Sequence, residues 1–212
     1  MSNLRYPRCR RGWSAVIAQP DVAAMTAAGR ARRVAEADLA TKVLITGRPG
    51  VGKTTVIQKV LSAVGSVAGG FLTEEIRQRG HRVGFRVRDL HDGAEGILAH
   101  VDRKRATRVG KYGVDVTSFE RVGVKALREA LRRRGAVIVD EIGKMELCSM
   151  AFRETVMEVM ESDHPVLGTI PFHRHPFLSR LRQRDDIVLV ELTMSNRAAL
   201  PQRLVALLHH GQ

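Results

Sequence analysis

Nine consecutive residues constrain the fold of this chain more than any other feature of its sequence. They run from Gly47 to Thr55, read GRPGVGKTT, and match the spacing G-x-x-x-x-G-K-[ST] of a phosphate-binding loop. The apolar segment 42–46 before them reads as a buried strand, and residues 53–64 after them read as a helix. A strand, a glycine-rich turn and a helix in this order predict an α/β domain with a mainly parallel sheet flanked by helices.

The glycine spacing in this loop has a physical cause. Glycine at three positions lets the backbone curl until successive N–H groups point at phosphate oxygens. The helix that begins near Lys53 adds the positive end of its dipole. The Lys53 side chain can bridge the terminal phosphates, and the Thr54 hydroxyl can bind Mg²⁺. The residues predicted to bind the phosphates are Gly47, Arg48, Pro49, Gly50, Val51, Gly52, Lys53, Thr54 and Thr55.

An acidic pair follows a second apolar run. Residues 136–142, AVIVDEI, read as a buried strand in which Asp140 and Glu141 come at the C-terminal end. Ligands of open α/β sheets bind at the carboxyl ends of the strands, so Asp140 is expected to support Mg²⁺ by holding one of its waters. Glu141 beside it can orient and polarise an attacking water, whereas a kinase would place an acceptor hydroxyl there.

The middle of the chain predicts a small antiparallel element. In the segment 82–88, Val, Phe and Val alternate with Arg82, Arg86 and Arg88, which indicates a strand with one apolar and one basic face. Strands are also expected at 69–76 and 96–101. The remaining expected elements are a helix around 119–131, a helix at 150–161, a strand at 164–170, a helix near 177–183, a strand at 187–192 and a last helical stretch from 196, interrupted or restarted at Pro201.

The charge of the chain is regional. Its 35 basic and 22 acidic residues give +13, and residues 77–134 alone hold sixteen bases and seven acids. We expect residues 1–40, also basic, to be a disordered or partly helical extension, and residues 41–212 to form the P-loop domain. A basic surplus makes nucleic acid a partner to consider. A triphosphate site together with Arg-biased coding, 28 Arg against 7 Lys, explains the surplus better, so nucleic acid is the less favoured partner.

Two further features bear on location. No apolar run approaches the roughly 18 to 20 residues that would span a bilayer, so no membrane association is expected. Cys9 and Cys148 cannot build a disulfide scaffold or a structural zinc site. A reducing, cytoplasmic location is therefore expected.

Five segments, taken in order, resemble the small cancer-related nucleoside-triphosphatases, a family of P-loop enzymes. They are GRPGVGKTT, GGFLTEEIRQRGHRVGFRVRDL, RVGKYGVDVTSFE, VIVDEIGKMEL and LGTIP, and the resemblance covers residues 41–210. The resemblance implies slow, Mg²⁺-dependent hydrolysis of nucleoside triphosphates to diphosphates. It also implies broad tolerance of the base, so that ATP, GTP and other nucleoside triphosphates are accepted. It further implies phosphate binding by residues 47–55, metal support by Asp140 and water activation by Glu141.

Two basic residues are candidates to neutralise charge in the transition state. Lys144 lies three residues past Glu141 and is the preferred catalytic candidate, and Arg108, in the expected loop RVGKYGV, is the other. Two alternative functions remain open: a nucleotide or small-molecule kinase with the same loop, and a nucleic-acid-associated protein whose ATPase acts as a switch.

Overall fold

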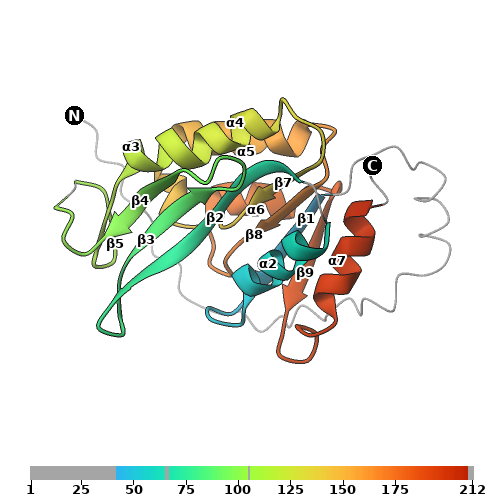
Figure 1. Cartoon of the computed structure of the whole chain (residues 1–212), viewed down its shortest axis with the longest axis horizontal. Helices are drawn as coiled ribbons and strands as arrows, with labels where there is room; N and C mark the ends of the chain where they lie inside the picture. Colours follow the sequence, from blue (N-terminus) through green and yellow to red (C-terminus); the bar gives the residue numbers. More distant parts are fainter. Residues whose placement is uncertain (1–41, 65–66, 105, 210–212) are drawn as a thin grey trace, which may run out of the picture. The chain divides into compact units, whose positions relative to one another are not determined.

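The computed structural model of the chain describes residues 42–64, 67–104 and 106–209. Within these residues, nine strands form one sheet in the order β5-β6-β4-β3-β2-β7-β8-β1-β9 (Figure 1). The expected extension, residues 1–40, lies outside the described residues. In the part of the chain that is described, no helix combines the length and apolarity needed to cross a membrane.

Five neighbouring strands form the parallel part of the sheet. They are β2 (Val67–Gln78), β7 (Ala136–Val139), β8 (Val166–Thr169), β1 (Lys42–Gly47) and β9 (Ile187–Leu192). Residues of β1, β7 and β8 are buried throughout, as expected for parallel strands covered on both faces. Strand β7 ends at Val139, so Asp140 and Glu141 follow the strand instead of belonging to it. The span 136–142 expected for this strand was too long at its C-terminal end.

The other four strands continue the sheet beyond β2, and we call them, together with residues 72–78 of β2, which pair with β3, the antiparallel wing. The four strands are β3 (His81–Asp89), β4 (Glu95–His100), β6 (Tyr112–Val114) and β5 (Arg108–Val109). The expectation that RVGKYGV is a loop was wrong, because it folds into the hairpin β5–β6. Gly110 turns that hairpin in the left-handed region, with φ of 58°.

A β-bulge changes the predicted basic face of β3. Ile76 pairs with Gly84 and Arg77 pairs with Arg82, so Val83 is an extra residue on its strand. A bulge of this kind shifts the alternation of side chains by one position. Arg82 therefore departs from the expected face, and its guanidinium lies 5.1 Å from the centroid of the Phe85 ring.

Glutamates on the neighbouring strands pair with the basic residues of β3. Glu74 forms ion pairs with Arg86 at 2.7 Å and with Arg88 at 3.3 Å. Glu75 forms another with Arg82 at 2.7 Å. Glu74 and Glu75 are consecutive on β2, so these cross-strand pairs place opposite charges side by side on opposite faces of the wing.

Helices cover both faces of the sheet. They are α2 (Lys53–Val64), α3 (Val116–Phe119), the π-helical turn η1 (Glu120–Val124), α4 (Lys125–Ala130), the 3₁₀ turn η2 (Glu146–Cys148), α5 (Met150–Glu161), α6 (Pro176–Arg182) and α7 (Leu200–His209). Helices α2 and α7 pack on one face, and α4, α5 and α6 pack on the other (Figure 1). The last helix starts at Leu200 instead of 196, with Pro201 in its first turn, where proline is tolerated.

An aromatic cluster stabilises the second of these faces. The rings of Phe71, Phe119 and Phe152 meet edge to face, with centroids 5.1 to 5.9 Å apart. Such pairs add about 0.5–1.5 kcal/mol each to the burial of the rings. The carbonyl of Phe71 also accepts the N–H of Asp140 at 3.3 Å. The cluster therefore anchors the backbone at the end of β7.

Candidate functional site

The loop after β1 has the geometry predicted for phosphate binding. Gly50 and Gly52 adopt φ of 76° and 106°, which favour glycine. A side chain at Gly47 would lie 2.8 Å from the carbonyl oxygen of Leu192, so β1 and β9 require glycine there. The loop residues Arg48 to Gly50 are exposed, and helix α2 starts at Lys53. The backbone N–H groups at this helix start are the donors that a phosphate would use.

Lys53 lies between the loop and the two predicted acids. Its Nζ donates a hydrogen bond to the carbonyl of Gly47 at 3.2 Å, which folds the side chain back over the loop. Burial raises the pKa of both Asp140 and Glu141, and the Lys53 charge opposes that rise. The structure therefore brings Lys53 close to Asp140 and Glu141.

Asp140 is only 1% exposed, and its two carboxylate oxygens differ. Oδ1 accepts a hydrogen bond from Thr169 Oγ1 at 2.9 Å, whereas Oδ2 is buried with no hydrogen-bond partner among the described residues. Burial raises the pKa of Asp140, and the Thr169 and Thr54 hydroxyls lower it. Thr54 is thus close to this carboxylate, although no hydrogen bond joins it to Oδ2.

The acid Glu146 was missed as a site residue. It is 4% exposed, and its Oε2 accepts the N–H of Gly143 at 3.1 Å. Burial, and next the charge of Glu141, raise the pKa of Glu146 to about 8. The residue lies in the DEIGKMEL segment that carries the family resemblance, but its burial depends on how the turn 140–146 packs, which the sequence pattern does not reveal.

Two threonines were also missed. Thr169 ends β8, the strand between β7 and β1, so its hydroxyl reaches Asp140 from the side of the phosphate loop. The hydroxyl of Thr73, on β2, donates to the carbonyl of Asp140 from the other side. The available sequence signal for Thr169 was a hydroxyl residue directly after the apolar run 165–168.

The two candidates for charge neutralisation lie in different places. Lys144 is exposed on the turn after β7. Burial lowers the pKa of His173, and the charge of Lys144 lowers it further, so these two side chains are near one another. Arg108 lies on the outermost strand β5, with four strands between it and β7, and donates to the carbonyl of Lys111 at 2.8 Å. Within this chain, Arg108 is therefore not brought to the site.

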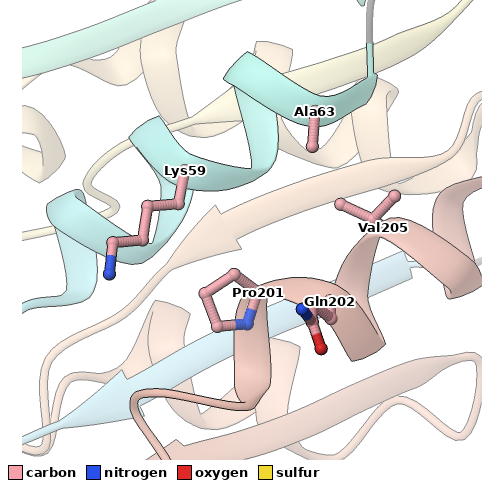
Figure 2. Close-up of a pocket in the computed structure, with 5 residues that line it drawn as sticks. All are labelled: Lys59, Ala63, Pro201, Gln202 and Val205. Atoms are coloured by element: carbon pink, nitrogen blue, oxygen red, sulfur yellow. The ribbon is translucent and has the colours of Figure 1, made fainter.

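Two surface cavities lie away from these residues. One, of about 240 Å³, is a groove between α2 and α7 lined by Lys59, Ala63, Pro201, Gln202 and Val205 (Figure 2). The other, of about 400 Å³, lies in the antiparallel wing beside Arg86 and Glu95. Neither is lined by a predicted site residue.

The oxygen donors at this edge fit Mg²⁺. Oδ2 of Asp140 is buried and has no partner among the described residues, and Thr54 lies nearby. Nowhere in the described ranges do three or more His, Cys, Asp or Glu side chains form a group that could hold a metal. Mg²⁺ is commonly bound by one or two protein oxygens together with substrate phosphates, so this sparse set matches its preference.

Comparison with known proteins agrees with the fold and the motifs. The sequence model of a family described as NTPase matches residues 42–205. The nucleoside-triphosphatase THEP1 of Thermotoga petrophila is 50% identical over 167 residues, which cover 79% of this chain and 92% of the relative. The protein of the same name from Methanosarcina acetivorans is 43% identical over 168 residues, covering 77% of this chain and 94% of the relative.

Solved structures give the same result. The crystal structure of THEP1 from Aquifex aeolicus aligns with a TM-score of 0.72 and 40% identity, covering 79% of this chain and 99% of that one. The solution structure of a human cancer-related nucleoside triphosphatase aligns with a TM-score of 0.70 and 38% identity, covering 82% of this chain and all of the other. The resemblance seen in the sequence is confirmed, and the chain belongs to the NTPase family.

Proposed function

We propose that this chain hydrolyses nucleoside 5′-triphosphates, including ATP and GTP, to nucleoside diphosphates and phosphate, with Mg²⁺ and with broad tolerance of the base. The observation that carries the proposal is the meeting of Lys53, Asp140 and Glu141 beside an exposed phosphate loop. Membership in the NTPase family supports hydrolysis as the overall reaction. The metal, the base tolerance and the role of each residue are the proposed parts.

Substrate binding would use the loop and Lys53. The backbone N–H groups within residues 47–55, other than Pro49, which has none, would surround the phosphates, and the Lys53 ammonium, now bonded to the Gly47 carbonyl, would turn to a phosphate oxygen. The Thr54 hydroxyl would bind Mg²⁺ directly, and Asp140 would hold it through a water. When bound, the ion offsets negative charge on the β- and γ-phosphates.

Glu141 would perform the proton transfer. Its burial raises its pKa toward the range in which a carboxylate is an effective base, while the Lys53 charge favours the ionised form. The carboxylate orients a water for in-line attack on the γ-phosphorus and takes a proton from it. The new P–O bond forms as the bond to the β–γ bridging oxygen breaks, which releases the diphosphate. Lys144 would neutralise charge that develops on the γ-phosphate oxygens.

The test replaces the proposed base. We expect Glu141→Gln to bind nucleotide as the parent does and to lose at least about tenfold in kcat, the scale of a removed general base. Phosphate release and the Kd of a fluorescent ATP analogue are measured together. Glu154→Gln, on the exposed face of α5, is the matched control and should behave as the parent.

Two further arms of the same experiment separate the alternatives. Asp140→Asn should raise the Mg²⁺ concentration needed for half-maximal turnover. Adding nucleosides, nucleoside monophosphates or RNA to the parent protein should not change the rate of phosphate release. Full activity in Glu141→Gln, or faster transfer of the γ-phosphate to an acceptor than to water, would refute the proposed hydrolysis.

A further inference from the structure

Glu146 is a buried acid that the reaction outlined above does not use. It comes from the turn η2, directly after the loop that carries Asp140 and Glu141, and only 4% of it is exposed. Among the described residues, no Lys or Arg forms an ion pair with it. Buried carboxyl groups without a cation are costly, so this one requires a structural or functional reason.

The contacts of Glu146 point to Glu141. A side-chain carbon at Gly143 would lie 2.8 Å from Glu146 Oε2 and 3.2 Å from Glu141 Oε1, so the two carboxyl groups border the space that this glycine leaves empty. Both backbone groups of Gly143 are also held by the turn. Its N–H donates to Glu146 Oε2 at 3.1 Å, and its carbonyl accepts the N–H of Leu147 at 3.0 Å.

Charge argues that Glu146 is the uncharged partner of this pair. A second carboxylate beside Glu141 and Asp140 would repel both, and burial removes the water that would stabilise it. The pKa of Glu146, raised to about 8 by burial first and by Glu141 second, agrees with a protonated group at neutral pH. A neutral acid can accept the Gly143 N–H through its carbonyl oxygen and still donate its own proton.

We propose that Glu146 is a positioning residue of the hydrolytic site, and that as a neutral acid it fixes the Gly143 turn and thereby the Glu141 carboxylate that activates water. The proposal rests on the proposed function, because Glu146 acts only through Glu141. It explains why a carboxyl side chain is buried here without a cation. It also explains the glycine at 143, since any side chain there would separate the two acids.

The test uses an isosteric and a shortened variant. Glu146→Gln keeps an oxygen for the Gly143 N–H and stays neutral, so its kcat should remain within about threefold of the parent. Glu146→Asp keeps the carboxyl group but shortens it by one methylene, and Glu146→Ala removes it. Both should lose about tenfold or more in kcat, because small displacements of a catalytic group are costly, while the Kd for an ATP analogue stays within about twofold.

A matched control separates positioning from stability. Glu120 accepts a hydrogen bond from Ser149 Oγ at 2.6 Å and supports the start of α5 in the same part of the molecule. Glu120→Ala should lower Tm as Glu146→Ala does, yet keep the parent kcat. If Glu146→Ala does not fold, Glu146→Gln and Glu146→Asp decide the question, since the proposal requires the first to be active and the second to be impaired.

A double-variant cycle distinguishes this proposal from the proposed function. If Glu146 acts through Glu141, the double variant Glu141→Gln with Glu146→Ala should lose no more kcat than Glu141→Gln alone. Additive losses would overturn the proposal and leave the function standing. Parent-like kcat in Glu146→Asp, or a loss in Glu146→Gln as large as in Glu146→Ala, would also overturn it. Full activity in Glu141→Gln would instead refute the proposed function.

Discussion

Carboxylates in the antiparallel wing and at the end of β7 experience opposite environments. In the wing, the hydrogen bond from Arg82 lowers the pKa of Glu75, against the effect of its slight burial. At the end of β7, burial raises the pKa of Asp140 and of Glu146. Paired surface charges contribute little and cost little, whereas buried acids without a matching cation lower stability. Acids kept at such a cost are candidates for a functional site.

The architecture of the sheet creates this difference. Parallel strands are covered by helices on both faces, so a side chain that follows such a strand leaves water. Antiparallel strands of the wing keep one face in solvent, where Arg and Glu meet across strands. Acidic residues therefore form exposed ion pairs in the wing and are buried beside the carboxyl ends of the parallel strands, which we call the parallel edge.

The prediction with the largest expected effect concerns the cation at the parallel edge. Among the described residues, Lys53 is the cation whose charge lowers the pKa of both Asp140 and Glu141. Lys53→Ala should lower kcat/KM by roughly 10²–10³, since it removes a phosphate contact and leaves the acids uncompensated. Phosphate-release kinetics measure the loss. Lys59→Ala, an exposed position on the same helix, should match the parent, and a loss of less than about tenfold in Lys53→Ala would contradict the role given to this edge.

A second test uses pH to detect the buried acid. The folded pKa of Glu146, about 8, lies above its ordinary value of 4.5, so the folded protein holds a proton that the unfolded chain releases between these pH values. The contribution of this group to the free energy of unfolding therefore falls as the pH rises from 4.5 to 8. At the upper end the loss is on the order of a few kcal/mol, as expected from the size of the pKa shift.

Urea unfolding at about pH 5 and pH 8 checks this result. The parent protein should lose more stability over that range than Glu146→Gln, which cannot release a proton. Glu154→Gln is again the control and should retain the full pH dependence. Equal pH dependence in the parent and in Glu146→Gln would show that Glu146 is ionised in the folded state at these pH values.

The features predicted from sequence are those with a local cause. The loop 47–55, the helix 53–64 and the strand 187–192 each follow from glycine spacing or apolar periodicity within a few residues. The roles of Asp140 and Glu141 remain predictions, but their placement at the carboxyl edge follows from the rule that ligands bind there.

The features that sequence missed depend on distant parts of the chain. The bulge at Val83 needs the register of β2 against β3, and the burial of Glu146 needs the packing of a turn that lacks any periodic pattern. Thr169 meets Asp140 only because β8 lies between β7 and β1. Pairing order in a sheet is set by long-range contacts, which a single sequence does not display.

The test with the smallest expected effect breaks two ion pairs of the wing. Glu74 bridges Arg86 and Arg88, with its side chain 23% exposed and those of the two arginines 44% and 38% exposed. Glu74→Gln should lower the free energy of unfolding by less than about 1 kcal/mol, and salt at about 1 M should reduce that loss because it screens exposed charges. Urea unfolding at low and high salt measures both effects, with Glu95→Gln, which removes one pair with Arg86, as a second variant. Turnover should be unchanged in both, because the proposed hydrolysis uses the buried acids of the parallel edge. A fall of more than about threefold would show that the wing contributes to the site and that the two regions are not independent.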